Sequence, residues 1–161
     1  MVKCSKKPEE FQQRLNSLQR KFKDLYNEVA PAIAGNVAVR LFKKNFQDEG
    51  FFGQAWKEVK RRENPWTRGA AASRGILTGN TGDLGRSIEY KIEGDGKVII
   101  FTNPSEFVHS KEPYGRVHNE GLRSGRGSGF IMPKRQFIGD HPELRRAIID
   151  ELERKLKEFE N

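Results

Sequence analysis

The fold is decided by the stretch Ser87-Ile88-Glu89-Tyr90-Lys91-Ile92, which is followed by Gly94-Asp95-Gly96 and by Lys97-Val98-Ile99-Ile100-Phe101-Thr102. The first run alternates polar and apolar side chains, as a strand with one face on a core does. The glycines around Asp95 supply the positive-φ positions of a tight turn. The sequence therefore predicts a β-hairpin over residues 87–92 and 98–102. Because four consecutive apolar residues place bulk on both faces of the second strand, we expect that strand to be central in its sheet.

Apolar residues recur at helical spacing on both sides of this hairpin. Before it, one stripe begins at Phe11 and a second at Ile33, and Pro31 separates them. The spacing predicts two N-terminal helices, at residues 8–30 and 33–46, which lie roughly antiparallel and turn their apolar faces to the sheet. After the hairpin, Asp140 is the expected N-cap of a C-terminal helix. The apolar stripe of that helix consists of Leu144, Ile148, Leu152, Leu156 and Phe159.

These elements predict one α+β domain over residues 1–161. Its antiparallel sheet is built around the central β-hairpin and is packed by two N-terminal helices and one C-terminal helix. Residues 51–76 have no amphipathic period, and we expect a flexible arm there. Residues 114–121 predict either a helical turn or a short strand, and residues 130–132 predict a returning strand.

Positive charge is concentrated in the N-terminal half. The formal net charge is +8, and residues 1–74 carry 16 Lys and Arg against 8 Asp and Glu. The single cysteine, Cys4, excludes an internal disulfide. No apolar run approaches the length of a membrane span or the pattern of a signal peptide. We therefore expect a protein that is made and kept in a cytoplasm and has no membrane partner.

The sequence contains no recognisable catalytic or cofactor-binding motif. His118 and Glu120 could be combined with His109 or His141 as metal ligands, but their spacing matches no known metal-ligand pattern. Residues 79–85 resemble a phosphate loop, yet no Lys-Ser/Thr pair follows them, and we interpret them as a turn that positions Leu84. We expect no enzyme activity, no cofactor and no metal site.

The basic segment between Lys57 and Arg74 is the candidate for a nucleic-acid contact, since its charges would release counterions from phosphates. Trp56 and Trp66 lie beside and within it. A solvated surface and pairing with an acidic neighbouring subunit are the other interpretations. The sequence leaves all three open.

Short motifs follow one another in a fixed order along the chain. The first half contains Phe46-Gln47-Asp48-Glu49-Gly50, Gly53-Gln54-Ala55-Trp56-Lys57, Ile76-Leu77-Thr78-Gly79 and Thr81-Gly82-Asp83-Leu84-Gly85-Arg86-Ser87-Ile88. The second half contains residues 98–103, Pro113-Tyr114-Gly115-Arg116-Val117-His118-Asn119-Glu120-Gly121 and Met132-Pro133-Lys134-Arg135-Gln136-Phe137-Ile138-Gly139. Over residues 40–140 this series resembles the tailed-bacteriophage virion morphogenesis family, whose members include tail-completion proteins. Leu122 and Gln136 depart from its pattern, because the family commonly has glycine and proline there.

The resemblance implies a structural phage or prophage protein without enzyme activity, which finishes the tail or joins head to tail during virion assembly. We expect a homo-oligomeric ring whose other partners are tail or neck proteins, first in the host bacterial cytoplasm and then in the virion. A nucleic-acid-binding module that uses the basic N-terminal half is the alternative, and a DNA contact is also compatible with the assembly role.

Five residues in or near the motifs are candidates for an interface. Tyr and Arg offer apolar bulk with a polar end, which suits interface cores, and most of these residues lie where little regular structure is predicted. Local support of the loops by Tyr114 and His118, and a core position for Phe137, are the alternatives. The interface candidates are Trp56, Tyr114, His118, Arg135 and Phe137.

Overall fold

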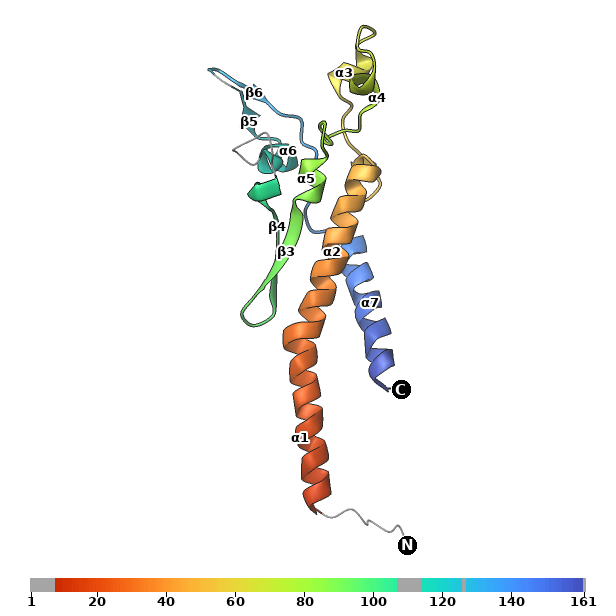
Figure 1. Ribbon diagram of the computed structural model, residues 1–161, viewed down its shortest axis with the longest axis vertical. Coiled ribbons are helices and arrows are strands. Elements are labelled where there is room, and N and C mark those ends of the chain that lie inside the picture. The colour runs from red at the N-terminus through yellow and green to blue at the C-terminus, as the bar shows by residue number, and fades with distance from the viewer. Residues whose placement is uncertain (1–7, 107–113, 126, 161) are drawn as a thin grey trace.

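The longest feature of the molecule is one uninterrupted helical run (Figure 1). It consists of helix α1 (Pro8–Asp24), a π-helical turn η1 (Leu25–Val29) and helix α2 (Ala30–Gln47). The computed structural model describes residues 8–106, 114–125 and 127–160 of the chain. Within them the fold is α+β, as predicted, with helices at both ends of the chain and small antiparallel sheets between them.

The predicted antiparallel pair of N-terminal helices is wrong, because the chain does not turn at Pro31. This proline lies in the first turn of α2, where its missing N–H is tolerated. Directly before it, the N–H of Ala30 donates to the carbonyl oxygen of Leu25, five residues back. This wider turn lets the helix pass the proline without ending.

The predicted hairpin is confirmed. Strand β3 (Ile88–Glu93) pairs antiparallel with strand β4 (Lys97–Thr102), from Ile88 opposite Thr102 to Glu93 opposite Lys97. The central position predicted for the second strand is wrong, since in the described part of the chain β3 is the only strand that pairs with β4. Helix α2 packs on this hairpin. Its Gly35 makes the approach close, because a methyl group there would lie 2.3 Å from Cδ2 of Tyr90.

The C-terminal helix α7 (Pro142–Glu160) is confirmed and packs along α2. It begins one residue later than expected, at Pro142, and Asp140 does not act as its cap. The carboxylate of Asp140 instead accepts a hydrogen bond from Nε of Arg145 at 2.8 Å. Nδ1 of His141, directly before the helix, accepts one from the backbone N–H of Glu143 at 3.3 Å.

Short elements connect these parts at the end of the molecule opposite α1 (Figure 1). After α2 come strands β1 (Gly50–Phe51) and β2 (Gln54–Ala55), and then three short helices, α3 (Lys60–Glu63), α4 (Ala70–Ser73) and α5 (Asp83–Arg86). After β4 come η2 (Pro104–Glu106), α6 (Gly115–Glu120) and the paired strands β5 (Arg123–Ser124) and β6 (Phe130–Ile131).

Two further expectations are settled by these elements. Residues 114–121 form a helical turn rather than a strand, and it ends at Gly121 with φ +72°. The returning strand predicted at residues 130–132 is confirmed as β6.

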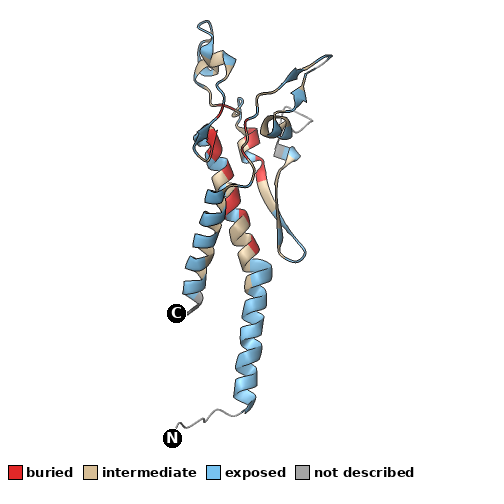
Figure 2. Ribbon diagram, turned by 180° about the vertical axis from the view of Figure 1, so that it is seen from behind, coloured by how far each residue is buried: buried red, intermediate tan, exposed pale blue. Residues whose placement is uncertain are grey.

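The hydrophobic core surrounds the C-terminal half of α2 (Figure 2). Leu84 and Ile88 are fully buried in it. The turn expected at residues 79–85 is shorter than predicted, because α5 begins at Asp83 and places Leu84 in the core. The buried core residues are Ala38, Phe42, Phe46, Phe51, Trp56, Ile76, Leu84, Ile88 and Phe137.

Helix α1 lies outside this core, and it contains no buried residue. Figure 2 shows it exposed along its length. The expectation that its apolar face meets the sheet is therefore wrong. The large apolar residues exposed on this part of the helical run are Phe11 (64%), Leu15 (39%), Leu18 (43%), Phe22 (65%) and Tyr26 (68%). Among the described residues, no helix is both long and apolar enough to cross a membrane.

Candidate functional site

The structure brings the five predicted interface residues together around the segment that precedes α7. Phe137 is 1% exposed, and its ring centroid lies 5.1 Å from that of Phe46. The ring of Trp56 also packs edge-on against Phe46, with the ring centroids 5.5 Å apart. Nε1 of Trp56 donates to the carbonyl oxygen of Gln136 at 2.7 Å. Phe137 and Trp56 are thus part of the chain's own core.

Arg135 connects this segment to the chain that follows β2. It is 6% exposed, and its Nε and Nη2 donate to the carbonyl oxygens of Lys57 at 2.9 Å and Glu58 at 3.2 Å. Its backbone N–H donates to the carbonyl oxygen of His118 at 2.8 Å. Burial lowers the pKa of Arg135 from its usual value. The guanidinium therefore holds backbone segments together from within the fold.

Tyr114 and His118 lie on one side of α6 and contact each other edge to face, with ring centroids 5.8 Å apart. Burial, and then the charge of Arg135, lower the pKa of His118 below 6.5, so its ring is neutral at pH 7. Burial, and then Asp83, raise the pKa of Tyr114. Within the described residues, Nδ1 of His118 is buried without a hydrogen-bond partner.

Two asparagines that the sequence analysis did not single out hold the same segment. Oδ1 of Asn119 accepts from the backbone N–H groups of Phe137 and Ile138, both at 2.9 Å. Nδ2 of Asn45, which is 3% exposed, donates to the carbonyl oxygen of Phe137 at 3.1 Å. Nothing in the sequence pattern marks these amides, because an asparagine in a helix usually points to solvent.

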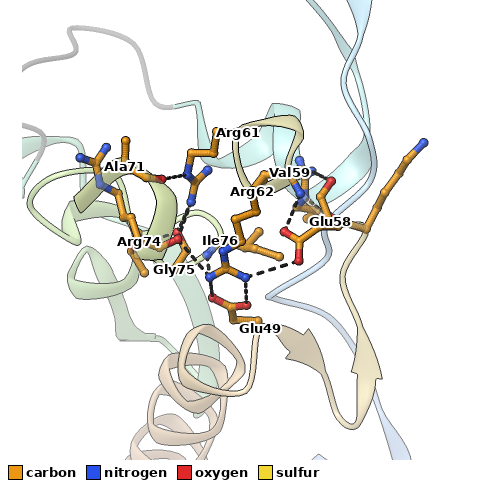
Figure 3. Close-up of polar contacts among 12 residues, drawn as sticks. Glu49, Glu58, Val59, Arg61, Arg62, Ala71, Arg74, Gly75 and Ile76 are labelled. Atoms are coloured by element: carbon orange, nitrogen blue, oxygen red, sulfur yellow. Dashed lines mark hydrogen bonds and ion pairs between the residues drawn. The ribbon is translucent and has the colours of Figure 1, made fainter. Parts of the chain in front are cut away.

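A second polar cluster lies at the base of the segment between β2 and α5 (Figure 3). The carboxylate of Glu49 accepts two hydrogen bonds from Arg62, at 2.6 and 2.7 Å, and one from the backbone N–H of Ile76 at 2.9 Å. Arg61 donates to the carbonyl oxygens of Ala71, Arg74 and Gly75 at 2.7–3.0 Å. The hydrogen bonds from Arg62 lower the pKa of Glu49.

This cluster bears on the predicted arm at residues 51–76. Phe51, Trp56 and Ile76 are buried, so both ends of the arm are packed in the core. The middle part carries α3 and α4 and projects from the body (Figure 1). Arg61 and Arg62 hold its base through the contacts of Figure 3. The flexibility of the projecting part stays a prediction.

The contacts described for the five interface candidates are therefore contacts within the chain. Their contribution to an interface stays a prediction. The structure instead exposes a row of large apolar side chains on α1. Its spacing was visible in the sequence but was assigned to the core. No group of three or more metal-ligating side chains occurs among residues 8–106, 114–125 and 127–160, and His109 lies outside these ranges.

Comparison with known proteins identifies a family. Residues 7–157 match the sequence model of the phage virion morphogenesis family. No curated protein and no solved structure matches the chain. The matched region includes α1, α2, the core, the hairpin, the segment around Phe137 and most of α7. The chain therefore belongs to the phage virion morphogenesis family and has a role in phage assembly.

Proposed function

We propose that the protein is a structural subunit that acts in tail completion or head–tail joining and forms a ring with its own copies. Its other partners are tail or neck proteins, and it is assembled in the host bacterial cytoplasm before it becomes part of the virion. Family membership supports the assembly role. The chemistry of the site is consistent with it, because the polar clusters described above fasten backbone segments to one another.

The observation that carries the assembly role, as distinct from the ring, is the exposure of α1. Large apolar side chains in contiguous exposed patches are uncommon on proteins that work alone, and they mark surfaces that other chains cover. Five of them line the helical run from Phe11 to Tyr26, and each is at least 39% exposed. A subunit that is completed by its neighbours accounts for this exposure, since the neighbours remove the apolar surface from water.

Deletion of the gene from the phage or prophage that carries it tests the function. Electron microscopy of the lysate is expected to show unfinished tails, or heads and tails that have not joined, and the wild-type gene supplied in trans restores complete particles. The kind of intermediate that accumulates distinguishes the two roles. Normal particles without the gene would contradict the proposal. A ring predicts several copies around the tail axis in averaged images of the complete particle.

Nucleic-acid binding by the outer part of the arm is a second candidate function. Trp66 is 80% exposed, and Lys60 and Arg68, which lie six residues before it and two residues after it in the sequence, are also exposed. An exposed indole among cations can stack on a base while the cations contact phosphates. Binding to single-stranded DNA that weakens steeply with salt, and that a Trp66→Ala variant loses, is the result expected from this alternative.

A further inference from the structure

The exposed face of α1 has the spacing of a helix-packing seam. Phe11, Leu15, Leu18 and Phe22 follow one another at intervals of four, three and four residues. This is the a/d pattern of a coiled coil, in which the side chains of one helix insert between those of a facing helix. A surface of this kind is complementary to another helix, because its narrow stripe follows the seam between two helices.

The e and g positions that flank this seam between Phe11 and Phe22 carry positive charge and no negative charge, and one acidic residue, Glu10, lies beside Phe11 and Arg14 at its N-terminal end. Arg14 and Lys21 precede Leu15 and Phe22 by one residue and so lie along one side of the seam. The corresponding positions on the other side are Gln12 and Gln19. All four side chains are exposed. A facing helix would therefore meet two cations and two neutral amides along the seam.

A second copy of α1 is a poor match for this surface. In one antiparallel pair, Phe11 packs against the partner's Phe22 and Leu15 against the partner's Leu18. In this arrangement the side of the seam that carries Arg14 and Lys21 lies next to the same side of the partner's seam. Arg14 would then face the partner's Lys21, and the same contact would occur twice. Like charges at these positions oppose association.

A parallel pair is opposed by the rest of the fold. The exposed face continues through Tyr26 to a hollow of about 250 Å³, which is lined by Ala30 and Ala34 of the helical run, Gly96 and Val98 of the hairpin and Leu152 of α7. The hairpin and α7 thus occupy the space beside the run directly after the seam (Figure 1). Two parallel copies would bring these parts of both molecules to the same place.

We propose that α1 binds an amphipathic helix of another virion protein, one with an apolar seam flanked by acidic residues. Such a helix covers Phe11, Leu15, Leu18 and Phe22 and places carboxylates opposite Arg14 and Lys21. This inference deepens the proposed assembly role and rests on it for the source of the partner. The chemistry of recognition is a property of the purified chain and is measured on it directly.

The test uses two synthetic helical peptides of about three heptads, both with leucine at the a and d positions. One carries glutamate at the flanking e and g positions and the other carries lysine. The full-length protein is expected to bind the glutamate peptide at least about tenfold more tightly than the lysine peptide, with a preference that shrinks as salt is added. Equal binding of both peptides, or no binding of the glutamate peptide, would overturn the proposal.

Variants locate the binding on the seam. Leu18→Glu places a charge in the seam and is expected to weaken binding of the glutamate peptide by about a hundredfold. Gln13→Glu adds the same charge at an exposed position on the side of α1 that faces away from the seam. It is the matched control, with an expected change in binding of less than about threefold. Since α1 contributes no buried residue, both variants should keep the wild-type circular dichroism and melting curve.

A charge reversal tests the specificity. The double variant Arg14→Glu with Lys21→Glu is expected to prefer the lysine peptide over the glutamate peptide. A preference that stays unchanged would overturn the role of the flanks. Self-association of the protein that Leu18→Glu abolishes would assign the seam to a second copy and overturn the proposal. Failure of any of these tests leaves the effect of gene deletion on particles untouched, so it is distinguishable from failure of the assembly role.

Discussion

At Phe137, three parts of the chain that are distant in sequence meet. Its ring packs against Phe46 of α2, its N–H is held by Asn119 of α6 and its carbonyl oxygen by Asn45 of α2. A buried ring that is also fixed through its backbone leaves little room for relaxation when the ring is removed. The side chain therefore determines how the last segment before α7 is attached to the body.

Truncation of this ring is expected to be costly. Phe137→Ala should lower the free energy of unfolding by about 3–5 kcal/mol, because it removes apolar burial and leaves a cavity. Phe130→Ala is the matched control, since Phe130 is 56% exposed and its truncation should cost less than about 1 kcal/mol. Urea unfolding followed by circular dichroism measures both. Equal losses for the two variants would contradict the core position of Phe137.

His118 makes stability depend on pH. Its pKa is lowered from 6.5 in the folded chain, so the unfolded chain binds the proton more readily. The free energy of unfolding therefore rises with pH up to about the ordinary value, and stability is lost as pH falls below it towards the lowered value. Glu49, whose pKa is lowered from 4.5, adds a second loss in a more acidic range. His118→Gln should flatten the urea-unfolding midpoint between about pH 7 and pH 5.5. A slope that equals that of the wild type would refute the assignment.

At the scale of elements, local patterns predicted what local chemistry determines. Alternation in residues 87–92 and the glycines around Asp95 were sufficient for the hairpin, because both act within a few residues. The rule that proline ends a helix did not predict the path at Pro31. The π-helical turn directly before it lets the helical run continue although Pro31 has no N–H to donate. The structure brings the candidate residues together and buries Trp56, Arg135 and Phe137, which for Phe137 was the stated alternative. Their part in an interface stays a prediction. Motif position says nothing about which chain covers a side chain.

The stripe of α1 shows the same limit more clearly. An apolar face at helical spacing is identical whether the chain's own sheet or another protein covers it. Burial distinguishes the two cases, and burial is a property of the whole fold. The interval pattern from Phe11 to Phe22 favoured a narrow seam, which was the available signal for a helix–helix contact.

The contact between α2 and the hairpin depends on the absence of a side chain at Gly35. Gly35→Ala would place a methyl group 2.3 Å from Cδ2 of Tyr90 and must displace the ring. We expect a loss of about 1–3 kcal/mol of unfolding free energy, and a smaller loss in the Tyr90→Ala background because the obstructing ring is gone. Gly94→Ala is the control, since no atom lies within 4 Å of its added methyl group. Additive effects of Gly35→Ala and Tyr90→Ala would speak against this contact.

The arm between β2 and α5 is expected to become more mobile when the contacts of Arg62 at its base are removed. Arg62→Ala removes the hydrogen bonds to Glu49 and to the carbonyl oxygen of Arg74. Trypsin should then cleave within residues 57–74 faster than in the wild type, while the hairpin stays protected. Arg68→Ala removes an exposed arginine from the same arm and should not accelerate cleavage at the remaining sites. Unchanged cleavage of Arg62→Ala would show that the arm is held by other contacts.

As a whole, the molecule is elongated, with its core near one end of the helical run (Figures 1 and 2). Helix α1 extends from one end of the body, and the arm and the β5–β6 hairpin extend from the other (Figure 1). Exposed apolar side chains occur on all three projections, including Trp66 (80%) and Ile131 (77%). A subunit that contacts neighbours on several sides accounts for this distribution, whereas a protein that acts alone would gain nothing from it.

The yield of complete particles from a phage that lacks the gene, supplied in trans with variants of it, tests the central claim most directly. The account predicts that Gln13→Glu restores particles as the wild type does, and that Leu18→Glu is present at the same level, folded, yet leaves tails unfinished or unjoined. Because the Leu18 side chain touches no part of the buried core, only a contact with another chain explains such a loss. Full restoration by Leu18→Glu would contradict the claim that the exposed face of α1 is the surface through which this protein assembles.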